Sequence, residues 1–467
     1  MMVAVVPRTT AAFKSVNNQK EFSNLLDIYM KTSNYNIFIN SDRGVLVFNA
    51  LTDSYVFVND DEAKSLKTRE FISSGIFESE RIKRFQDAGI LVKDDFNELA
   101  YLKHVYSKEM HESDVFDLTI LPTLDCNVHC WYYFENKNVG SRITPNVKGN
   151  ILLFIQNIIK DRPYIKEISI DLFGGEPLLH YEEDLDDFLH QIKNVVEGLG
   201  KKATFLFITN GLRLTEEVMD RIKDLSPQFQ ISIDGYKERH DKIKVLSKHA
   251  DISTYDLVIH NLKNVCKCDH VHVILRLNYD EQTLKNVGKI LSDIKDIARS
   301  KLSIHFERVW QTKKHIAITN DALIDAWKLF VSHGFQVTYL KFFHTPSSCM
   351  SSKQDQVAIS YDGKIFKCTG CDFARTEEDG NLMSDGNITW KGNKAEERIQ
   401  IQTYNHPECL QCKLLPLCWG PYCQKHLLKK EKVMETCQLK SMEMPLESFL
   451  LLRYVSCYNQ EHDGKKV

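Results

Sequence analysis

Cysteine is the residue type in this sequence that points most directly to chemistry. The chain has 13 cysteines in 467 residues, and eight of them lie between Cys349 and Cys437. Two more, Cys126 and Cys130, have three residues between them, in a loop-like stretch that follows an apolar run stopped by Pro122. Thiolates hold iron–sulfur clusters, and a short loop can wrap one. The same spacing also suits two small apolar side chains on a buried helix face.

The C-terminal cysteines show a second spacing. Cys409, Cys412 and Cys418 follow a C-x2-C-x5-C pattern. Spacing alone does not decide between two kinds of metal site, because C-x2-C pairs hold zinc as well as iron–sulfur clusters. Clustered cysteines in a reducing compartment bind metal more often than they form disulfides. The remaining cysteines, Cys266, Cys268 and Cys457, match no ligand pattern and are predicted to be unliganded.

Composition narrows the classes of function. The chain has 60 basic and 63 acidic residues, a net charge of −3, so nothing predicts a nucleic acid or an anionic membrane as partner. Hydrophobic residues make up 43% and charged residues 26%, as in ordinary globular proteins. No apolar run reaches the roughly 18 residues that span a bilayer, and residues 1–14 do not resemble a signal peptide. We therefore expect a cytoplasmic protein of two to four domains.

The elements that must position these residues alternate along the middle of the chain. Apolar runs predict strands at residues 118–121, 168–173, 205–209, 229–233, 271–277 and 302–308. Helical patterns follow them at a start near Thr144-Pro145, at 182–199, near 215, at 253–265, at 281–299 and at 321–333. Six β/α units of this kind favour a parallel sheet with right-handed crossovers. They are too few for an eight-fold barrel, so we expect a partial barrel.

Polar residues collect where the predicted strands end. The first strand leads into Cys126 and Cys130, and the fifth carries Arg276 and Asn278. The second, third and fourth lead into Gly174-Gly175-Glu176-Pro177, Thr209-Asn210-Gly211 and Ser232-Ile233-Asp234-Gly235. The carboxyl ends of parallel strands meet at one rim, where barrel enzymes place their chemistry. The sequence therefore predicts one site at this rim.

Together these motifs resemble the radical S-adenosylmethionine (SAM) family with a SPASM domain. The family pattern is C-x3-C-x2-C with a Tyr before the third Cys; Cys126, Cys130 and Tyr132 fit, and Tyr133 stands at the third cysteine position. The resemblance implies an α/β fold, a partial (β/α)6 TIM-like barrel. It also implies a winged-helix-like peptide-recognition module at residues 1–112, a radical SAM core at 113–335 and a cysteine-rich SPASM domain at 336–467.

The resemblance also implies cofactors and their ligands. Cys126 and Cys130 would hold a [4Fe-4S] cluster that binds SAM. The residues implied in SAM binding are Gly174, Gly175 and Glu176 for the amino group, Asn210 for the ribose, and Ser232, Asp234 and Arg276 for the carboxylate and its surroundings. Glu307 is a rival structural partner for Arg276. One auxiliary cluster would use Cys409, Cys412, Cys418 and Cys437; another would use Cys349, Cys368 and Cys423, with Cys371 as a candidate fourth ligand.

Three functions remain open. The first is a peptide maturase that uses a SAM-derived radical on a ribosomally made precursor peptide, with a reducing electron donor protein as second partner. The second is a pseudoenzyme, impaired because Tyr133 replaces a thiolate, that binds a peptide or a catalytic partner. The third is an anaerobic sulfatase-maturing enzyme, which has an Asp directly after the cysteine that Cys368 matches. Here Thr369 follows it, and Asp372 lies behind Cys371.

The N-terminal module reads as small strands and short helices. Strand-like runs occur at 35–39, 45–49 and 55–58, helices begin near 60 and at 80–88, and a last strand lies at 90–92. Its mixed charges make DNA binding improbable. The resembled maturases use such a module to hold a leader peptide, which can add a strand to a sheet edge; a structural cap on the barrel is the alternative. Residues 98–117 are predicted to be an irregular linker.

Overall fold

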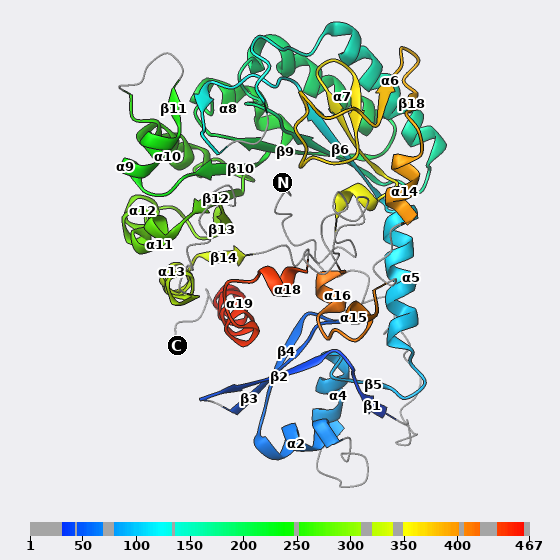
Figure 1. The fold of residues 1–467 in the computed structure, drawn as a ribbon, viewed down its shortest axis with the longest axis vertical. Coiled ribbons are helices and arrows are strands. Elements are labelled where there is room, and N and C mark those ends of the chain that lie inside the picture. The colour runs from blue at the N-terminus through cyan, green and yellow to red at the C-terminus, as the bar shows by residue number, and fades with distance from the viewer. Residues whose placement is uncertain are drawn as a thin grey trace.

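A computed structural model describes residues 30–42, 44–68, 79–132, 136–246, 252–309, 320–339, 349–400, 406–420 and 437–461. Its centre is a mixed α/β unit built on a sheet (Figure 1). A separate N-terminal module lies at the opposite end of the molecule, and C-terminal helices lie between the two.

Seven parallel strands form the centre of this sheet. They are β6 (Val115–Leu121), β8 (Glu167–Leu172), β9 (Lys202–Thr209), β10 (Gln228–Ile233), β12 (Val273–Tyr279), β13 (Leu302–Arg308) and β14 (Gln336–Tyr339), and they neighbour one another in this order. The predicted α/β class and the six predicted strands are confirmed. β14 was not predicted, because four residues give too short an alternation to stand out. Within the described residues the ladder ends at β14 and β18, so it is open.

Helices connect these strands. They are α6 (Pro145–Asp161), π-helical η1 (Tyr181–Leu185) running into α7 (Asp186–Gly198), α8 (Glu216–Ile222), α9 (Lys237–Ile243), α10 (Thr254–Val265), α11 (Glu281–Lys285), α12 (Val287–Ile294) and α13 (Asn320–Ser332). In α6 the Thr144 hydroxyl accepts a hydrogen bond from the Val147 backbone and Pro145 opens the helix, as predicted. Ile159 is buried in α6, whereas Ile158 is only half-buried.

The cysteine-rich third of the chain extends the same sheet. β15 (Gln356–Ser360) pairs in parallel with β6, and β16 (Lys364–Phe366), β17 (Gly380–Leu382) and β18 (Ile388–Trp390) continue it antiparallel. Gly363 has φ of +83° at the turn between β15 and β16, which favours glycine. The sheet therefore crosses the predicted boundary at residue 336. The 3-10 helix η3 (Met350–Ser352) precedes β15. The helices that follow β18 are α14 (Lys394–Gln400), α15 (Pro407–Leu410), α16 (Leu415–Cys418), α18 (Gln438–Ser441) and the longer α19 (Leu446–Glu461).

The N-terminal module contains the predicted elements. β2 (Asn36–Ser41), β3 (Gly44–Asn49) and β4 (Ser54–Val58) form an antiparallel sheet, β1 (Met30–Thr32) pairs with β5 (Leu91–Lys93), and α2 (Asp60–Thr68) and α4 (Ser79–Asp87) complete it. The module rests on the C-terminal helices: Lys413 donates to the Asn36 carbonyl (3.0 Å), and Arg453 of α19 is paired with Asp53.

The predicted linker is wrong in its first part. Residues Glu98–His111 form α5, a four-turn helix capped by Asn97, whose side chain accepts from the Ala100 backbone. Leu102, Tyr106 and Met110 are buried at four-residue spacing, and this period is masked in the sequence by the charged residues between them. No helix in the described part of the chain is long and apolar enough to cross a membrane.

Candidate active site at the strand ends

The loop after β6 holds the two candidate cluster cysteines. Asp125 organises it: one carboxylate oxygen accepts from the Cys126 backbone (2.7 Å) and the other from Gly140 (2.9 Å). The short strand β7 (Val128–His129) lies between the cysteines and pairs with β11 (Val245–Leu246). Burial raises the pKa of the Cys126 thiol and raises that of Cys130 to about 12. Binding a metal would therefore release protons from both thiols.

The Gly174-Gly175 pair follows β8 and packs against the backbone of this loop. Gly174 has φ of +117°, and a Cβ on Gly175 would lie 2.0 Å from the Asp125 carbonyl oxygen. The Gly175 and Glu176 amides donate to the Thr123 and Asp125 carbonyls at 3.1 and 2.8 Å. The close packing of the loop after β8 against the loop after β6 therefore requires glycine here. This reason is additional to the close approach of a ligand that the resemblance implies.

Glu176 lies behind the wall of the site. It is fully buried, and its carboxylate accepts from the Thr209 hydroxyl (2.7 Å), the Asn210 backbone (2.8 Å) and the Leu178 backbone (3.1 Å). Burial raises its pKa. Both oxygens are therefore occupied in joining the ends of β8 and β9. The expected contact with the SAM amino group requires an oxygen that points toward the ligand, and neither oxygen does so here.

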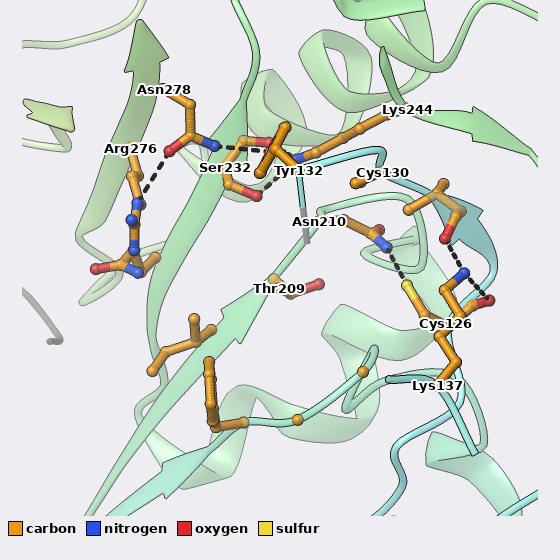
Figure 2. Close-up of a pocket in the computed structure, with 16 residues that line it drawn as sticks. Cys126, Cys130, Tyr132, Lys137, Thr209, Asn210, Ser232, Lys244, Arg276 and Asn278 are labelled. Atoms are coloured by element: carbon orange, nitrogen blue, oxygen red, sulfur yellow. Dashed lines mark hydrogen bonds between the residues drawn. The ribbon is translucent and has the colours of Figure 1, made fainter. Parts of the chain in front are cut away.

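Most of the other motif residues meet around one cavity of about 70 Å³ (Figure 2). Seven predicted residues line it: Cys126, Cys130, Gly174, Gly175, Asn210, Ser232 and Arg276. In Figure 2 Cys126 and Arg276 stand on opposite sides of it. The volume is below the roughly 300–1,000 Å³ typical of ligand pockets. A ligand of nucleoside size would therefore require side chains to move.

Tyr132 is the side chain that joins the cysteine loop to the strand ends. Its hydroxyl donates to Asp234 (2.5 Å) and accepts from Asn278 (3.1 Å), and Asn278 also donates to Asp234 (2.9 Å). Burial, reinforced by Asp234, raises the Tyr132 pKa well above its usual value. Asp234 thus acts behind the cavity as a shared acceptor. The neighbouring Tyr133 lies outside the described residues.

Lys244 is a functional candidate that the sequence analysis missed. Its ammonium donates to the Ser232 carbonyl (2.5 Å) and hydroxyl (2.6 Å) and lies 3.5 Å from Asp234. Burial by itself raises the pKa of Asp234, but the Lys244 charge, His240 and the hydrogen bonds from Tyr132 and Asn278 together lower it. Lys244 stands in the apolar run Ile243–Leu246. A charge inside an apolar run needs a partner, and on that ground the sequence could have indicated Lys244.

Arg276 has the structural partner considered as its rival. Its guanidinium donates to Asn278 (3.2 Å) and lies 3.7 Å from the Glu307 carboxylate, which is also 3.5 Å from His305. Because Arg276 also lines the cavity, the pair with Glu307 leaves part of the guanidinium facing it. The structure therefore places two buried cations, Lys244 and Arg276, at the same cavity.

Four of the C-terminal cysteines lie near one another. Burial, and to a smaller extent neighbouring thiols that include Cys437, raise the pKa of Cys409, Cys412 and Cys418. Of the other candidates, the Cys371 thiol donates to the Cys368 carbonyl (3.1 Å), and Cys349 is buried near Ser351. Cys423 and the side chain of Cys457 are outside the described residues. Cys266 is buried in the core.

Over the described ranges, no three or more His, Cys, Asp or Glu side chains are arranged to hold a metal ion. Asp372, the residue considered for a sulfatase-maturing role, is engaged elsewhere. Its carboxylate accepts from the Asn136 backbone (3.1 Å) and from the Asn136 side chain. Asn138 donates to Tyr361 (2.6 Å). Three hydrogen bonds therefore tie the loop after Cys130 to the cysteine-rich third.

The strand-end site and the open parallel sheet agree with the comparison against known families. Residues 120–294 match the model of the radical SAM superfamily. The match runs from β6 to α12 and covers every loop that contributes to the cavity. The chain is therefore an enzyme that contains a radical SAM domain, and enzymes with this domain use a [4Fe-4S] cluster and SAM.

Individual relatives are distant. The radical SAM cyclopropyl synthase TigE of Paramaledivibacter caminithermalis is 21% identical over 387 residues, which cover 73% of this chain and 75% of TigE. Among solved structures, native anSMEcpe with bound AdoMet has a TM-score of 0.55 at 18% identity and covers 74% of this chain and 99% of its own. Streptococcus suis SuiB bound to precursor peptide SuiA has a TM-score of 0.51 at 14% identity, covering 88% and 100%. These structures share the fold.

Proposed function

We propose that this protein modifies a ribosomally synthesised peptide through SAM-derived radical chemistry. The observation that carries the proposal is the meeting of seven motif residues, from loops after three strands and from within two more, around one cavity. The relation to TigE and the fold shared with SuiB, which is described with its precursor peptide, support a peptide substrate.

The residues present suit the cofactors in kind. Cys126 and Cys130 would hold the cluster, which, together with SAM, supplies a 5′-deoxyadenosyl radical when bound. Ser232, Lys244 and Arg276 would bind the SAM carboxylate, because two buried cations there have only partial compensation from Asp234 and Glu307. Asn210 and the Gly174-Gly175 backbone would contact the rest of the ligand.

The direct experiment pairs the protein with a short open reading frame encoded beside its gene. The two are co-expressed anaerobically, and the peptide is recovered and analysed by mass spectrometry. We expect a mass loss of hydrogen atoms, as in cross-link formation, that requires intact Cys126. An unmodified peptide together with an intact second radical SAM gene in the same neighbourhood would favour the scaffold alternative over catalysis.

Auxiliary clusters are part of the proposal, supported by the proximity of the four thiols near α15, α16 and α18. We predict that Cys412→Ala lowers the iron and sulfide content of anaerobically reconstituted protein by about one cluster, because a cubane in proteins is held by four cysteines. Cys266→Ala, a buried core cysteine, is the matched control and should keep its iron. Stoichiometric zinc without sulfide would overturn the prediction.

The N-terminal module is proposed to bind the leader of the precursor. Its three-stranded sheet has β2 and β4 as edges in the described ladder, and a peptide can add a strand to such an edge. Deleting residues 1–96 should weaken precursor affinity by about tenfold or more while iron content is kept. Fluorescence anisotropy with a labelled precursor measures the affinity. Unchanged affinity with intact clusters would leave the module a structural cap.

A pseudoenzyme is the second candidate, and a specific observation favours it: Tyr133 stands where the third cluster thiolate is expected. In this version the cavity keeps its SAM-binding residues but cleaves SAM slowly or not at all. Its decisive experiment is the substitution Tyr133→Cys.

A further inference from the structure

The outer side of the cysteine loop carries a second, open cavity of about 380 Å³. It is lined by His129, Cys130, Trp131, Asn136, Lys137, Lys242 and Ile243. Cys130 and Lys137 line both this cavity and the one at the strand ends. A single side-chain layer therefore separates the outer surface from the place where the cluster would be held.

This surface is cationic. Lys242 is exposed and has no carboxylate within 4 Å in the part of the chain that the structure describes. Its neighbours on α9 are neutralised, because Lys237 is paired with Asp256 and Arg239 with Asp280. Lys137 donates to the carbonyls of Cys126 and Val128, which position its charge without cancelling it.

The nearby carboxylate of α9 is turned away from this surface. Asp241 accepts from the Tyr255 backbone (2.8 Å) and the Ser253 hydroxyl (2.7 Å), and so caps α10. The cationic side chains beside the cavity therefore keep their charges for an incoming partner.

An exposed aromatic lines the same cavity as these cations. Trp131 is 58% exposed, and its ring stands edge-on to Tyr132 at 5.7 Å. Tryptophan surrounded by polar residues is characteristic of protein interfaces, where it supplies much of the binding energy. The combination of one exposed Trp with Lys137 and Lys242 fits a partner with an acidic face around an apolar spot.

We infer that this surface, made of His129, Trp131, Lys137 and Lys242, docks an acidic one-electron donor protein, such as a reduced ferredoxin. The inference rests on the proposed function, which requires an electron. One electron would pass from the donor's reduced centre, which is oxidised by one unit, to the cluster that Cys126 and Cys130 would hold, which is reduced by one unit. Complementary charge would steer the encounter and fix its orientation. The peptide substrate fits this outer surface less well. The strand-end residues Arg276 and Asn278 line only the inner cavity, so the substrate is expected to approach the site there.

The test measures donor affinity directly. Binding of a small acidic [4Fe-4S] ferredoxin to the full-length protein is followed by calorimetry at low and high salt. We expect Lys242→Glu to weaken binding roughly tenfold at low ionic strength, and the difference to shrink as salt screens the charges. Trp131→Ala should weaken binding at both salt concentrations, because its contribution is mainly apolar.

The matched control is Lys160→Glu, the same charge reversal at an exposed position in the last turn of α6. Equal ferredoxin affinity of the two charge variants would overturn the inference, as would Lys242→Glu weakening a precursor peptide and leaving ferredoxin binding unchanged. Failure of the proposed function would appear separately, as protein that holds no iron or does not bind SAM, since ferredoxin affinity is measured independently of both.

Discussion

Tyr133→Cys should increase iron binding at the first site and allow SAM cleavage. With only Cys126 and Cys130 as thiol ligands in the motif, a cubane lacks the third thiolate of the C-x3-C-x2-C pattern. Tyrosine is a poor substitute for a thiolate ligand, because its phenol has a pKa of about 10 and its side chain is longer and planar. Loss of an outer partner of a metal ligand already costs about 10–100-fold in affinity, so restoring a direct ligand should gain at least as much.

The measurement has three parts: iron per chain, the change in the electron paramagnetic resonance signal when SAM is added, and 5′-deoxyadenosine formed under dithionite. Tyr132→Cys is the control, because it introduces a thiol one position away and removes the hydroxyl that binds Asp234. It should gain none of the three. If the unsubstituted protein already cleaves SAM as fast as the Tyr133→Cys variant, Tyr133 is a working replacement and the pseudoenzyme hypothesis is wrong.

Lys244→Met should be the most damaging single substitution at the cavity. It removes the ammonium that bonds Ser232 and faces Asp234, and leaves a fully buried carboxylate without its main counter-charge. Breaking a buried pair in this way costs about 3–5 kcal/mol. SAM affinity should fall as well, since a carboxylate-binding cation is lost. Lys285→Met, which removes an exposed lysine paired with Glu281, should have little effect on either.

The loss of stability should depend on pH in a defined direction. In the unsubstituted protein the Asp234 pKa is lowered, so its contribution is present above the unfolded pKa of about 3.9 and is lost only in acid. Without Lys244, burial dominates and the folded pKa rises above the unfolded value. Stability from this group is then present at low pH and is lost as pH rises through the interval between the two values. The difference in melting temperature should therefore be smaller at pH 5 than at pH 7; a constant difference would contradict this explanation.

Periodic patterns and turn residues made the core of the fold predictable. Thr144-Pro145 marked the start of α6, and alternating apolar runs located six of the seven parallel strands. Local pattern did not reveal β14, which is four residues long, nor α5, whose buried residues are separated by charged ones. Both elements are stabilised by packing against distant parts of the chain, and a local window does not contain that information.

The site was predictable to the level of which loops meet. Strand-end motifs brought Cys126, Asn210, Ser232 and Arg276 to one cavity because parallel strands end on the same side. The role of each side chain was less predictable. The Glu176 carboxylate accepts hydrogen bonds from within the protein, including one from the Asn210 backbone. Lys244 reaches the cavity from the end of α9. Such assignments depend on three-dimensional neighbours that the motif itself does not name.

The bonds from Asp372 and Tyr361 to Asn136 and Asn138 bear on the order in which the protein matures on the ribosome. Translation delivers Cys126 and Cys130 more than 200 residues before Asp372, so the loop that bears them emerges without its anchors. β15 also supplies the strand that covers the free edge of β6. Iron delivered during synthesis would meet an unfinished loop. Insertion of the first cluster should therefore follow completion of the cysteine-rich third, and chains truncated before residue 356 should emerge without iron at the first site although every residue of its motif is present.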